Sequence, residues 1–261
     1  MKTALAQTNI ISENKKANKL TAEKMVTEAA LGGCRIIIFP EVSLTGFSMN
    51  MDKLAEPADN SETIRFFSRL AYENKIFISF GAALYDSDGS MKNYAVTVDD
   101  SGKVVCKYAK IHPYSHGVEG KFFAKGDSVK YFDIDGITVS TFLCYDLRFP
   151  EIFQAVSEKS RLIILMTNWP DVRIQHLDLL LRARAVENQS FFAAVNRAGK
   201  EMKYIYPGHS QIVSPTGQVL TPIREDEALI MYDIDIAEAD SYRSSYHLKA
   251  DRRPELYKKI L

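Results

Sequence analysis

Three reactive side chains of different types each follow a short apolar run that is typical of a buried strand. They are Glu41, Lys110 and Cys144, and a further apolar run is followed by Asn168 and Trp169. In open α/β sheets, ligands bind beyond the carboxyl ends of the strands. The pattern therefore predicts one site that these residues share, although they lie far apart in the chain.

Cys144 is the candidate nucleophile. It follows the apolar run at 137–143 and precedes Pro150, a residue type that is favoured at the first position of a helix. A helix N-terminus and a nearby lysine would lower the pKa of its thiol below the usual value of about 8.5. Cys34 and Cys106 stand before or inside apolar runs, so we expect structural roles for these two.

Glu41 and Lys110 would complete the chemistry of acyl transfer at a thiol. A carboxylate that follows an apolar run ending at Pro40 is poorly solvated, which raises its pKa toward neutrality and suits it to proton transfer. A fixed ammonium stabilises an oxyanion, by about 3 kcal/mol for one such donor, and the backbone N–H of Tyr145 is a second candidate donor. For either side chain taken alone, a solvated surface role is the commoner case.

This combination points to hydrolysis of a carbon–nitrogen bond. An amide carbonyl is a poor electrophile with a poor leaving group, so it needs a thiolate, a donor for the oxyanion and an acid for the departing ammonia. One glutamate can take the thiol proton, pass it to ammonia and later activate water. The residues therefore predict that a small amide is cleaved through a cysteine thioester.

Apolar runs alternate with stretches of helical periodicity along the whole chain. Strands are predicted at 3–7, 35–39, 76–84, 93–98, 103–108, 137–143, 162–166, 191–195, 210–213 and 228–234. Helices are predicted at 22–30, at 64–71 with a cap among 59–61, from Pro150, at 174–188, and as a short helix with a tail at 249–261. Interleaved elements of both kinds indicate an α/β fold. Hairpin-type turns at 86–89 and 99–102, mixed with helical crossovers, indicate a mixed sheet, and the many strands favour two packed sheets with helices outside.

The charges of the chain balance, with 33 Lys and Arg residues, 33 Asp and Glu residues and a formal net charge of zero. A balanced charge gives no electrostatic reason to expect nucleic acid or an anionic membrane as a partner. No stretch approaches the roughly 20 apolar residues of a membrane span, and no apolar run near the N-terminus is long enough for a signal peptide. Three widely spaced cysteines suit a reducing compartment, so we expect a cytoplasmic protein.

Five short motifs, in this order, resemble the nitrilase (carbon–nitrogen hydrolase) superfamily. They are Phe-Pro-Glu at 39–41, Tyr-Ala-Lys-Ile-His at 108–112, Cys-Tyr-Asp-Leu-Arg-Phe-Pro-Glu at 144–151, Asn-Trp-Pro at 168–170 and Ala-Arg-Ala-Val-Glu-Asn at 183–188. Each motif alone is weak, but their order over nearly the whole chain is highly specific. The resemblance implies a four-layer α-β-β-α sandwich, a single hydrolase domain over residues 1–261, and a homodimer.

The resemblance also implies roles for individual residues. It implies a catalytic triad of Glu41, Lys110 and Cys144, and it carries a second active-site glutamate onto Glu119. Within the superfamily the chain is most similar to the ω-amidase-like branch, which hydrolyses monoamides of short dicarboxylic or 2-oxo acids. The sequence departs from that pattern at Ala109 and at 113–114, in the loop that is expected to border the pocket.

Several residues around these motifs are candidates for binding the substrate. Tyr145, Asn168 and Trp169 stand beside the predicted nucleophile, and Trp169 suits a pocket wall and core packing equally well. Arg173 could hold a substrate carboxylate through bidentate hydrogen bonds, whereas His176 is expected on the helix surface or at an interface. The residues at 146, 148 and 151 are expected to form a structural ion-pair cluster.

No metal or cofactor is predicted. His112, His116, His176, His209 and His247 show no metal-ligand spacing, and the chain has no glycine-rich phosphate loop. Three alternatives remain open: a nitrilase or carbamoyl-amine hydrolase that uses the same triad, a Cys–His pair with His112 as the base, and a non-catalytic binding protein on the same fold.

Overall fold

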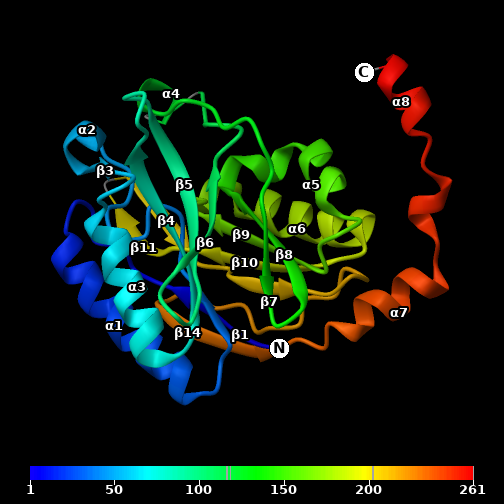
Figure 1. Cartoon of the computed structure of the whole chain (residues 1–261), viewed down its shortest axis with the longest axis horizontal. Helices are drawn as coiled ribbons and strands as arrows, with labels where there is room; N and C mark the ends of the chain where they lie inside the picture. The colour runs from blue at the N-terminus through cyan, green and yellow to red at the C-terminus, as the bar shows by residue number, and fades with distance from the viewer. Residues whose placement is uncertain (116, 118, 202, 261) are drawn as a thin grey trace.

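The computed structural model describes residues 1–115, 117, 119–201 and 203–260. Two sheets pack against each other, and helices cover their outer faces. Figure 1 shows α1 (Lys15–Leu31) and α3 (Glu62–Asn74) on one side of the sheets, with α5 (Pro150–Val156) and α6 (Ile174–Asn188) on the other. The predicted α-β-β-α sandwich is confirmed.

The first sheet contains β1 (Lys2–Gln7), β2 (Ile36–Ile38), β3 (Glu56–Pro57), β4 (Phe77–Tyr85), β5 (Met91–Val98), β6 (Val104–Ala109) and β14 (Ala228–Asp233). Its strand order is β14-β1-β2-β4-β5-β6, with β3 paired to β4. Strands β1, β2 and β4 run parallel, whereas β14, β5 and β6 join antiparallel. The sheet is therefore mixed, as the hairpin turns between its predicted strands indicated.

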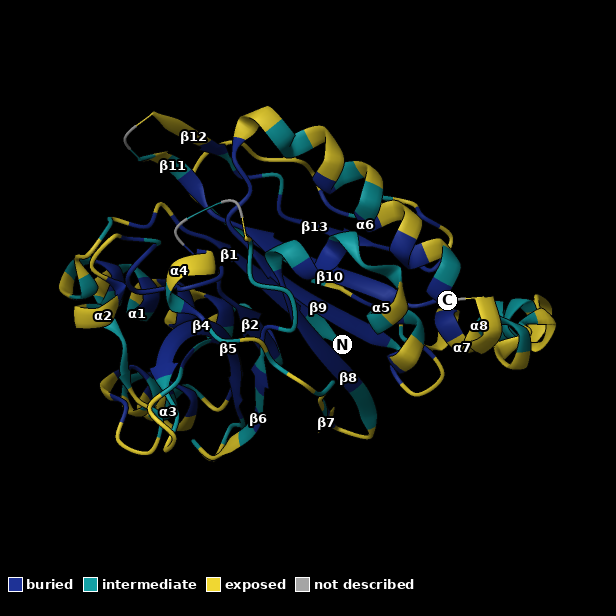
Figure 2. Cartoon of the chain, turned by 90° about the horizontal axis from the view of Figure 1, so that it is seen from above, coloured by how far each residue is buried: buried dark blue, intermediate teal, exposed yellow. Residues whose placement is uncertain are grey.

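The second sheet contains β7 (Tyr131–Ile134), β8 (Ile137–Leu143), β9 (Leu162–Thr167), β10 (Phe191–Asn196) and β13 (Gln211–Val213), in the order β13-β10-β9-β8-β7. Its three central strands are parallel, and β9 and β10 are apolar except for their last residues, which suits burial on both faces. Leu5 and Ile38 of the first sheet share one core cluster with Phe142 and Ile164 of the second. In Figure 2, β9 and β10 are buried along their whole length and β8 is buried beyond its first residues, whereas the outer face of α6 is exposed.

The ends of the helices follow the sequence signals. Asn14 caps α1 by accepting a hydrogen bond from the Ala17 N–H, and Gly32 ends that helix as predicted. Ser61, one of the predicted caps, does the same for α3. Pro150 opens α5 at its first turn, also as predicted. The predicted strands and main helices are confirmed within a few residues at their ends, except that α1 begins at Lys15, seven residues before the predicted start.

Several elements were not predicted. They are β3, β7, the hairpin of β11 (Ala198–Glu201) and β12 (Tyr204–Pro207), and the short helices α2 (Met51–Leu54), α4 (Glu119–Phe122) and α7 (Ala237–Ser245). Within the short helix and tail predicted at 249–261, the structure has the helix α8 (Pro254–Ile260), which has no buried residue. Figure 1 shows that α8 lies away from the two sheets, whereas α7 packs on the core through its buried Ala239. Among the described residues, no helix combines the length and the apolar character that a bilayer crossing requires.

Two glycines allow the chain to pass close to the segments that carry Glu41 and Lys110. A Cβ added at Gly81, within β4, would lie 2.3 Å from the Val42 nitrogen and 2.7 Å from the Glu41 Cα. A Cβ at Gly126 would lie 2.1 Å from the Ala109 carbonyl oxygen. Because the contacted atoms are backbone, they cannot rotate away, so glycine is required at both positions.

Candidate active site

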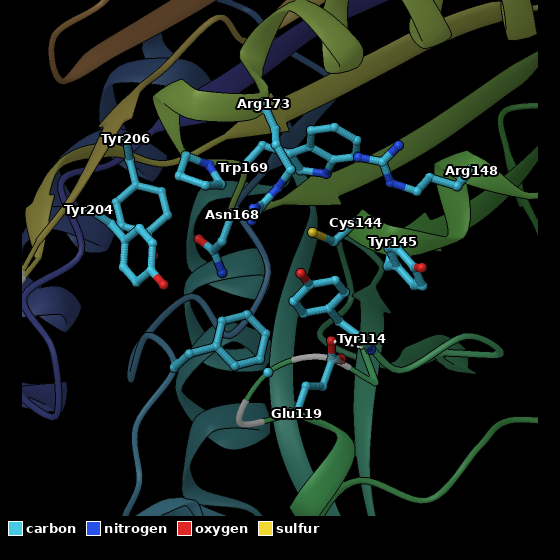
Figure 3. A pocket seen from close by; sticks show the side chains of 13 residues that line it. Tyr114, Glu119, Cys144, Tyr145, Arg148, Asn168, Trp169, Arg173, Tyr204 and Tyr206 are labelled. Atoms are coloured by element: carbon cyan, nitrogen blue, oxygen red, sulfur yellow. Dashed lines mark hydrogen bonds between the residues drawn. The ribbon is translucent and has the colours of Figure 1, made fainter.

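A pocket of about 240 Å³ opens where the two sheets meet, and Figure 3 shows the side chains that line it. The lining residues are Phe47, Tyr114, Gly117, Glu119, Cys144, Tyr145, Arg148, Asn168, Trp169, Pro170, Arg173, Tyr204 and Tyr206. Six of them are predicted site residues. The other two predicted site residues, Glu41 and Lys110, do not line the pocket and are fully buried.

Cys144 stands on a tight turn at the end of β8. Its φ of 43° lies in the left-handed region, which residues with a Cβ rarely adopt. The turn continues as a single stretch of 3-10 helix, Cys144–Arg148, before α5 begins. Such a backbone conformation is costly and persists only where the surroundings hold it in place.

Asp146 supplies much of that support. Its Oδ2 accepts hydrogen bonds from the Leu143 N–H at 3.1 Å and from the Tyr108 hydroxyl at 2.7 Å, and its Oδ1 accepts one from the His112 N–H at 3.0 Å. The carboxylate is completely buried. It thereby ties the turn that carries Cys144 to the end of β6 and the loop that follows it.

A buried ammonium lies between two buried carboxylates beside this turn. Lys110 Nζ donates to Glu41 Oε1 at 2.7 Å and to both carboxylate oxygens of Glu119 at 2.7 and 2.8 Å. None of the three side chains is more than 5% exposed. Charges that are buried away from water in this way interact strongly.

The pKa of Glu41 is the most informative consequence. Burial raises it to about 7, and the Glu119 charge adds to this, against the opposing effects of the Lys110 ammonium and the Cys144 thiol. This agrees with the prediction of a pKa near neutrality. For Lys110, burial alone would lower the pKa, but the charges of Glu41 and Glu119 raise it above its ordinary value, so the amine stays protonated.

The pKa of Cys144 contradicts the prediction. Burial and the Glu41 charge raise it well above the ordinary value, and the Lys110 ammonium and the backbone N–H of Asn168 only partly offset them. The lysine acts in the predicted direction, but desolvation and two carboxylates outweigh it. The resting thiol is therefore neutral and needs a base to remove its proton.

The Glu41 carboxyl lies beside this thiol. Its Oε1 accepts hydrogen bonds from Lys110 and Asn93, whereas its Oε2 makes no hydrogen bond of standard geometry among the described residues. The Cys144 thiol is near enough to the same carboxyl to affect its pKa. A buried oxygen without a partner next to a neutral thiol is an arrangement suited to proton transfer.

Asn168 and Trp169 follow β9 and border the nucleophile directly. The Asn168 side chain donates to the Glu41 carbonyl oxygen at 2.8 Å and so fixes the Glu41 turn. Asn196 holds Trp169 by accepting its N–H at 2.7 Å and donating to its carbonyl oxygen at 3.1 Å. Trp169 belongs to the core cluster and also lines the pocket, so both of its predicted roles hold.

Two arginines give the pocket positive charge. The guanidinium of Arg173 lies 5.7 Å from the ring centre of Tyr114, and that of Arg148 lies 4.7 Å from the ring centre of Trp169. In Figure 3, Arg173 and Trp169 are on one side of Cys144, and Tyr114 is on the other. Within the described part of the chain, neither arginine forms an ion pair with a carboxylate.

The predicted ion-pair cluster at 146, 148 and 151 is therefore wrong. Asp146 instead accepts hydrogen bonds from Tyr108, Leu143 and His112, which are nearer to it. Arg148 stacks on the Trp169 ring and approaches the ring of His176, with 3.2 Å between its Nη2 and the His176 Nδ1. Periodicity places these residues on one turn but does not reveal which neighbours compete for them.

Site residues that the sequence analysis did not identify include Asn93, Arg148, Phe47, Tyr204 and Tyr206. The last two come from the β11–β12 hairpin, and the ring of Tyr206 lies 4.3 Å from the buried guanidinium of Arg197. The alternation Tyr-Ile-Tyr at 204–206 is a strand signal that could have revealed the hairpin. A polar asparagine inside the apolar run of β5 could likewise have marked Asn93.

None of the described histidines takes part in the cluster of Glu41, Lys110, Glu119 and Cys144. His112 is held by Asp146, with 2.9 Å between Nδ1 and Oδ1, and its ring stacks on Phe149 with 3.8 Å between ring centres. It does not line the pocket, which argues against a Cys–His pair. In residues 1–115, 117, 119–201 and 203–260, no group of three or more potential ligands could hold a metal ion. His116 lies outside the described residues.

The family model described as carbon-nitrogen hydrolase matches residues 2–244. The chain is 33% identical to the 2-oxoglutaramate amidase of Paenarthrobacter nicotinovorans, over 88% of this chain and 82% of the relative. It is 30% identical to Omega-amidase NIT2 of Xenopus tropicalis, over 95% and 94% of the two chains. A CN-hydrolase superfamily protein of Xanthomonas campestris has a similar structure, with a TM-score of 0.90 at 26% identity over 97% of each chain. The chain belongs to the carbon–nitrogen hydrolase family.

Proposed function

We propose that this enzyme hydrolyses a small amide to a carboxylic acid and ammonia through a thioester on Cys144, and that residues 1–261 act as one hydrolase domain. The observation that carries the proposal is the neutral Cys144 thiol beside a Glu41 carboxyl whose pKa is raised to about 7 by burial. A base with a pKa near the working pH transfers protons most effectively.

The first half of the reaction forms the acyl-enzyme. Glu41 takes the thiol proton while the sulfur of Cys144 attacks the amide carbon, and the carbonyl oxygen becomes an oxyanion. The positive charge of Lys110 and the backbone N–H of Tyr145 stabilise that oxyanion. Protonated Glu41 then gives its proton to the amide nitrogen, the carbon–nitrogen bond breaks, and ammonia leaves a thioester behind.

The second half returns the enzyme to its resting state. Glu41 removes a proton from water, and the resulting hydroxide attacks the thioester carbon. The carbon–sulfur bond breaks, the thiolate takes the proton back from Glu41, and the acid departs. Glu119 keeps the Lys110 ammonium in place through both halves, because it accepts hydrogen bonds from Nζ with both of its oxygens.

The substrate class we propose is a monoamide of a short dicarboxylic or 2-oxo acid. A pocket of about 240 Å³ is smaller than the roughly 300–1,000 Å³ typical of drug-sized ligands. Arg173 lines it, and a guanidinium binds a carboxylate through two parallel hydrogen bonds. Relatives named 2-oxoglutaramate amidase and Omega-amidase support the same class. Nitriles and carbamoyl amines are the alternative substrates of the same three residues.

We also propose a cytoplasmic homodimer without nucleic-acid or membrane partners. Balanced charge and three free cysteines support the compartment and the absence of those partners. Val172, Leu179 and Val186 are 70%, 68% and 41% exposed and recur every seven residues along α6 and the turn before it. An apolar stripe on a helix face suits a second copy of the chain.

The most direct test is an ammonia-release assay over ω-amides of short dicarboxylic acids, neutral acyl amides, nitriles and carbamoyl amines. We expect ω-amides to give the highest kcat/KM. Cys144→Ala should abolish turnover while the circular dichroism spectrum is unchanged. Turnover near the wild-type rate in that variant would refute the nucleophile, and ammonia from a nitrile but not from its matching amide would favour the alternative.

The pH dependence follows from the raised pKa of Glu41. A base must be ionised to accept the thiol proton, so kcat/KM should fall about tenfold per pH unit below about 7. Glu41→Gln should remove this acidic limb together with most of the activity. Glu151→Gln, at an exposed glutamate of α5, is the control and should keep the limb. A wild-type limb at about 4.3, the ordinary value for glutamate, would argue against Glu41 as the base.

Arg173→Gln tests recognition of the carboxylate. A hydrogen bond to a charged group contributes about 1.5–3 kcal/mol, so KM for an ω-amide acid should rise about 10- to 100-fold. KM for a neutral acyl amide of the same length should stay within about threefold, because that substrate has no carboxylate to lose. Equal effects on both substrates would show that Arg173 supports the pocket wall and not the substrate charge.

The dimer is tested by Leu179→Glu. A buried unpaired carboxylate in an apolar contact is costly, so analytical ultracentrifugation should show a monomer where the wild type is a dimer. Leu20→Glu is the matched control, since Leu20 is 63% exposed but lies on α1. A variant at position 179 that sediments like the wild type would place the contact elsewhere.

A further inference from the structure

Asn93 completes a closed ring of hydrogen bonds around the two carboxylates. This fully buried residue of β5 donates from Nδ2 to Glu41 Oε1 at 2.8 Å and to Glu119 Oε1 at 2.9 Å. The same two oxygens each accept a hydrogen bond from Lys110 Nζ at 2.7 Å. Two donors and two acceptors therefore alternate around the ring, and only the donor from Asn93 is uncharged.

The side-chain amide can take only one orientation here. An amide nitrogen has two N–H groups, and both point at carboxylate oxygens, one for each acid. The flipped amide would direct its oxygen lone pairs at the same two anions. In the present orientation Asn93 Oδ1 has no hydrogen-bond partner among the described residues. The amide oxygen of Asn93 thus has no donor, while both N–H groups of its nitrogen are donated to Glu41 and Glu119.

The backbone fixes Asn93 relative to Lys110. The Lys110 N–H donates to the Asn93 carbonyl oxygen at 2.9 Å, at the end of the antiparallel pairing of β5 with β6. Asn93 therefore contacts Lys110 through its main chain and both glutamates through its side chain. A residue in this position can set the spacing of all three charged groups.

We propose that Asn93 is a positioning residue that holds Glu41 and Glu119 at one spacing beside a single lysine, and leaves Glu41 Oε2 to receive the Cys144 proton. The inference rests on the proposed function, because it assigns Asn93 to the same proton transfer. Asn93 and Lys110 together occupy the acceptor lone pairs of Glu41 Oε1, so the carboxyl has one anchored oxygen and one available oxygen.

The physical need for this residue is clear from the charges that face Glu41. They are the Lys110 ammonium, the Glu119 carboxylate and the Cys144 thiol. Two carboxylates in one dry site repel each other, and one of them tends to keep a proton. A neutral donor shared by both acids opposes that tendency without adding a second positive charge, which would stabilise the glutamate anion too well for it to act as a base.

The test compares Asn93→Leu and Asn93→Asp, which keep the size of the side chain but remove both N–H donors. Two rates are followed against pH: kcat/KM for the best amide, and alkylation of Cys144 by iodoacetamide. Loss of hydrogen bonds to a charged group should move the acidic limb of both profiles to higher pH, so both rates should fall about 10- to 100-fold at pH 7. KM should change less than about threefold. Asn93→Asp keeps a polar group in place if Asn93→Leu does not fold.

Thr97→Val is the matched control in the same strand. Its hydroxyl is buried and lies 2.7 Å from the hydroxyl of Ser79, so the variant also loses a buried hydrogen bond in β5. Thr97→Val should lower the stability of the protein, but the acidic limb of its pH profiles should stay at the wild-type pH. A limb that moves equally in Thr97→Val would mean that general loosening of the sheet is responsible, which overturns the role of Asn93.

The outcomes separate the two proposals. Folded Asn93 variants that keep the wild-type limb, while the wild type turns over amides, overturn the inference on Asn93 alone. A wild-type protein whose Cys144 alkylation has no limb near neutral pH overturns the proposed function and the inference together. An acidic limb that moves to higher pH in both Asn93 variants but not in Thr97→Val supports both the proposed function and the inference on Asn93.

Discussion

The arrangement depends on one buried ammonium between two buried carboxylates. Lys110 Nζ lies 2.7 Å from one oxygen of Glu41 and 2.7 Å from one oxygen of Glu119, out of contact with solvent. Burial raises the pKa of Glu41 to about 7. Because folding raises this pKa, ionisation of Glu41 as the pH rises through about 7 removes stability from the folded state. The ionised Glu41 therefore lowers the stability of the folded protein, but it leaves this carboxyl half ionised at neutral pH.

Both sheets are needed to build this cluster. Glu41 and Lys110 follow β2 and β6 of the first sheet, Cys144 follows β8 of the second, and Glu119 opens the short helix α4. Glycine at 81 allows β4 to touch the Glu41 turn, and Asp146 fixes the turn that carries the thiol. Charged groups of one sheet thus meet a nucleophile of the other, and the pocket lies where they meet.

The sequence predicted where strands end more reliably than how side chains meet there. The apolar runs before Glu41, Lys110 and Cys144 are long enough to indicate buried strands, so these positions could be placed at one edge of the fold. The wrong pKa direction for Cys144 has a physical cause. A lysine is visible in the sequence, but the depth of burial and the number of nearby carboxylates follow only from packing. Arg148 and Asn93 were missed because their partners are far away in the chain. The β11–β12 hairpin is local, and its strand signal at 204–206 was overlooked.

The central claim is that burial among these charges brings Glu41 to a pKa near neutrality in the resting protein. NMR titration of protein with isotope-labelled glutamate carboxyl carbons measures this directly, and the spectrum of Glu41→Gln identifies the resonance. We predict that the Glu41 signal titrates at about 7. Titration of that signal at about 4.3, as for a solvated glutamate, would contradict the account.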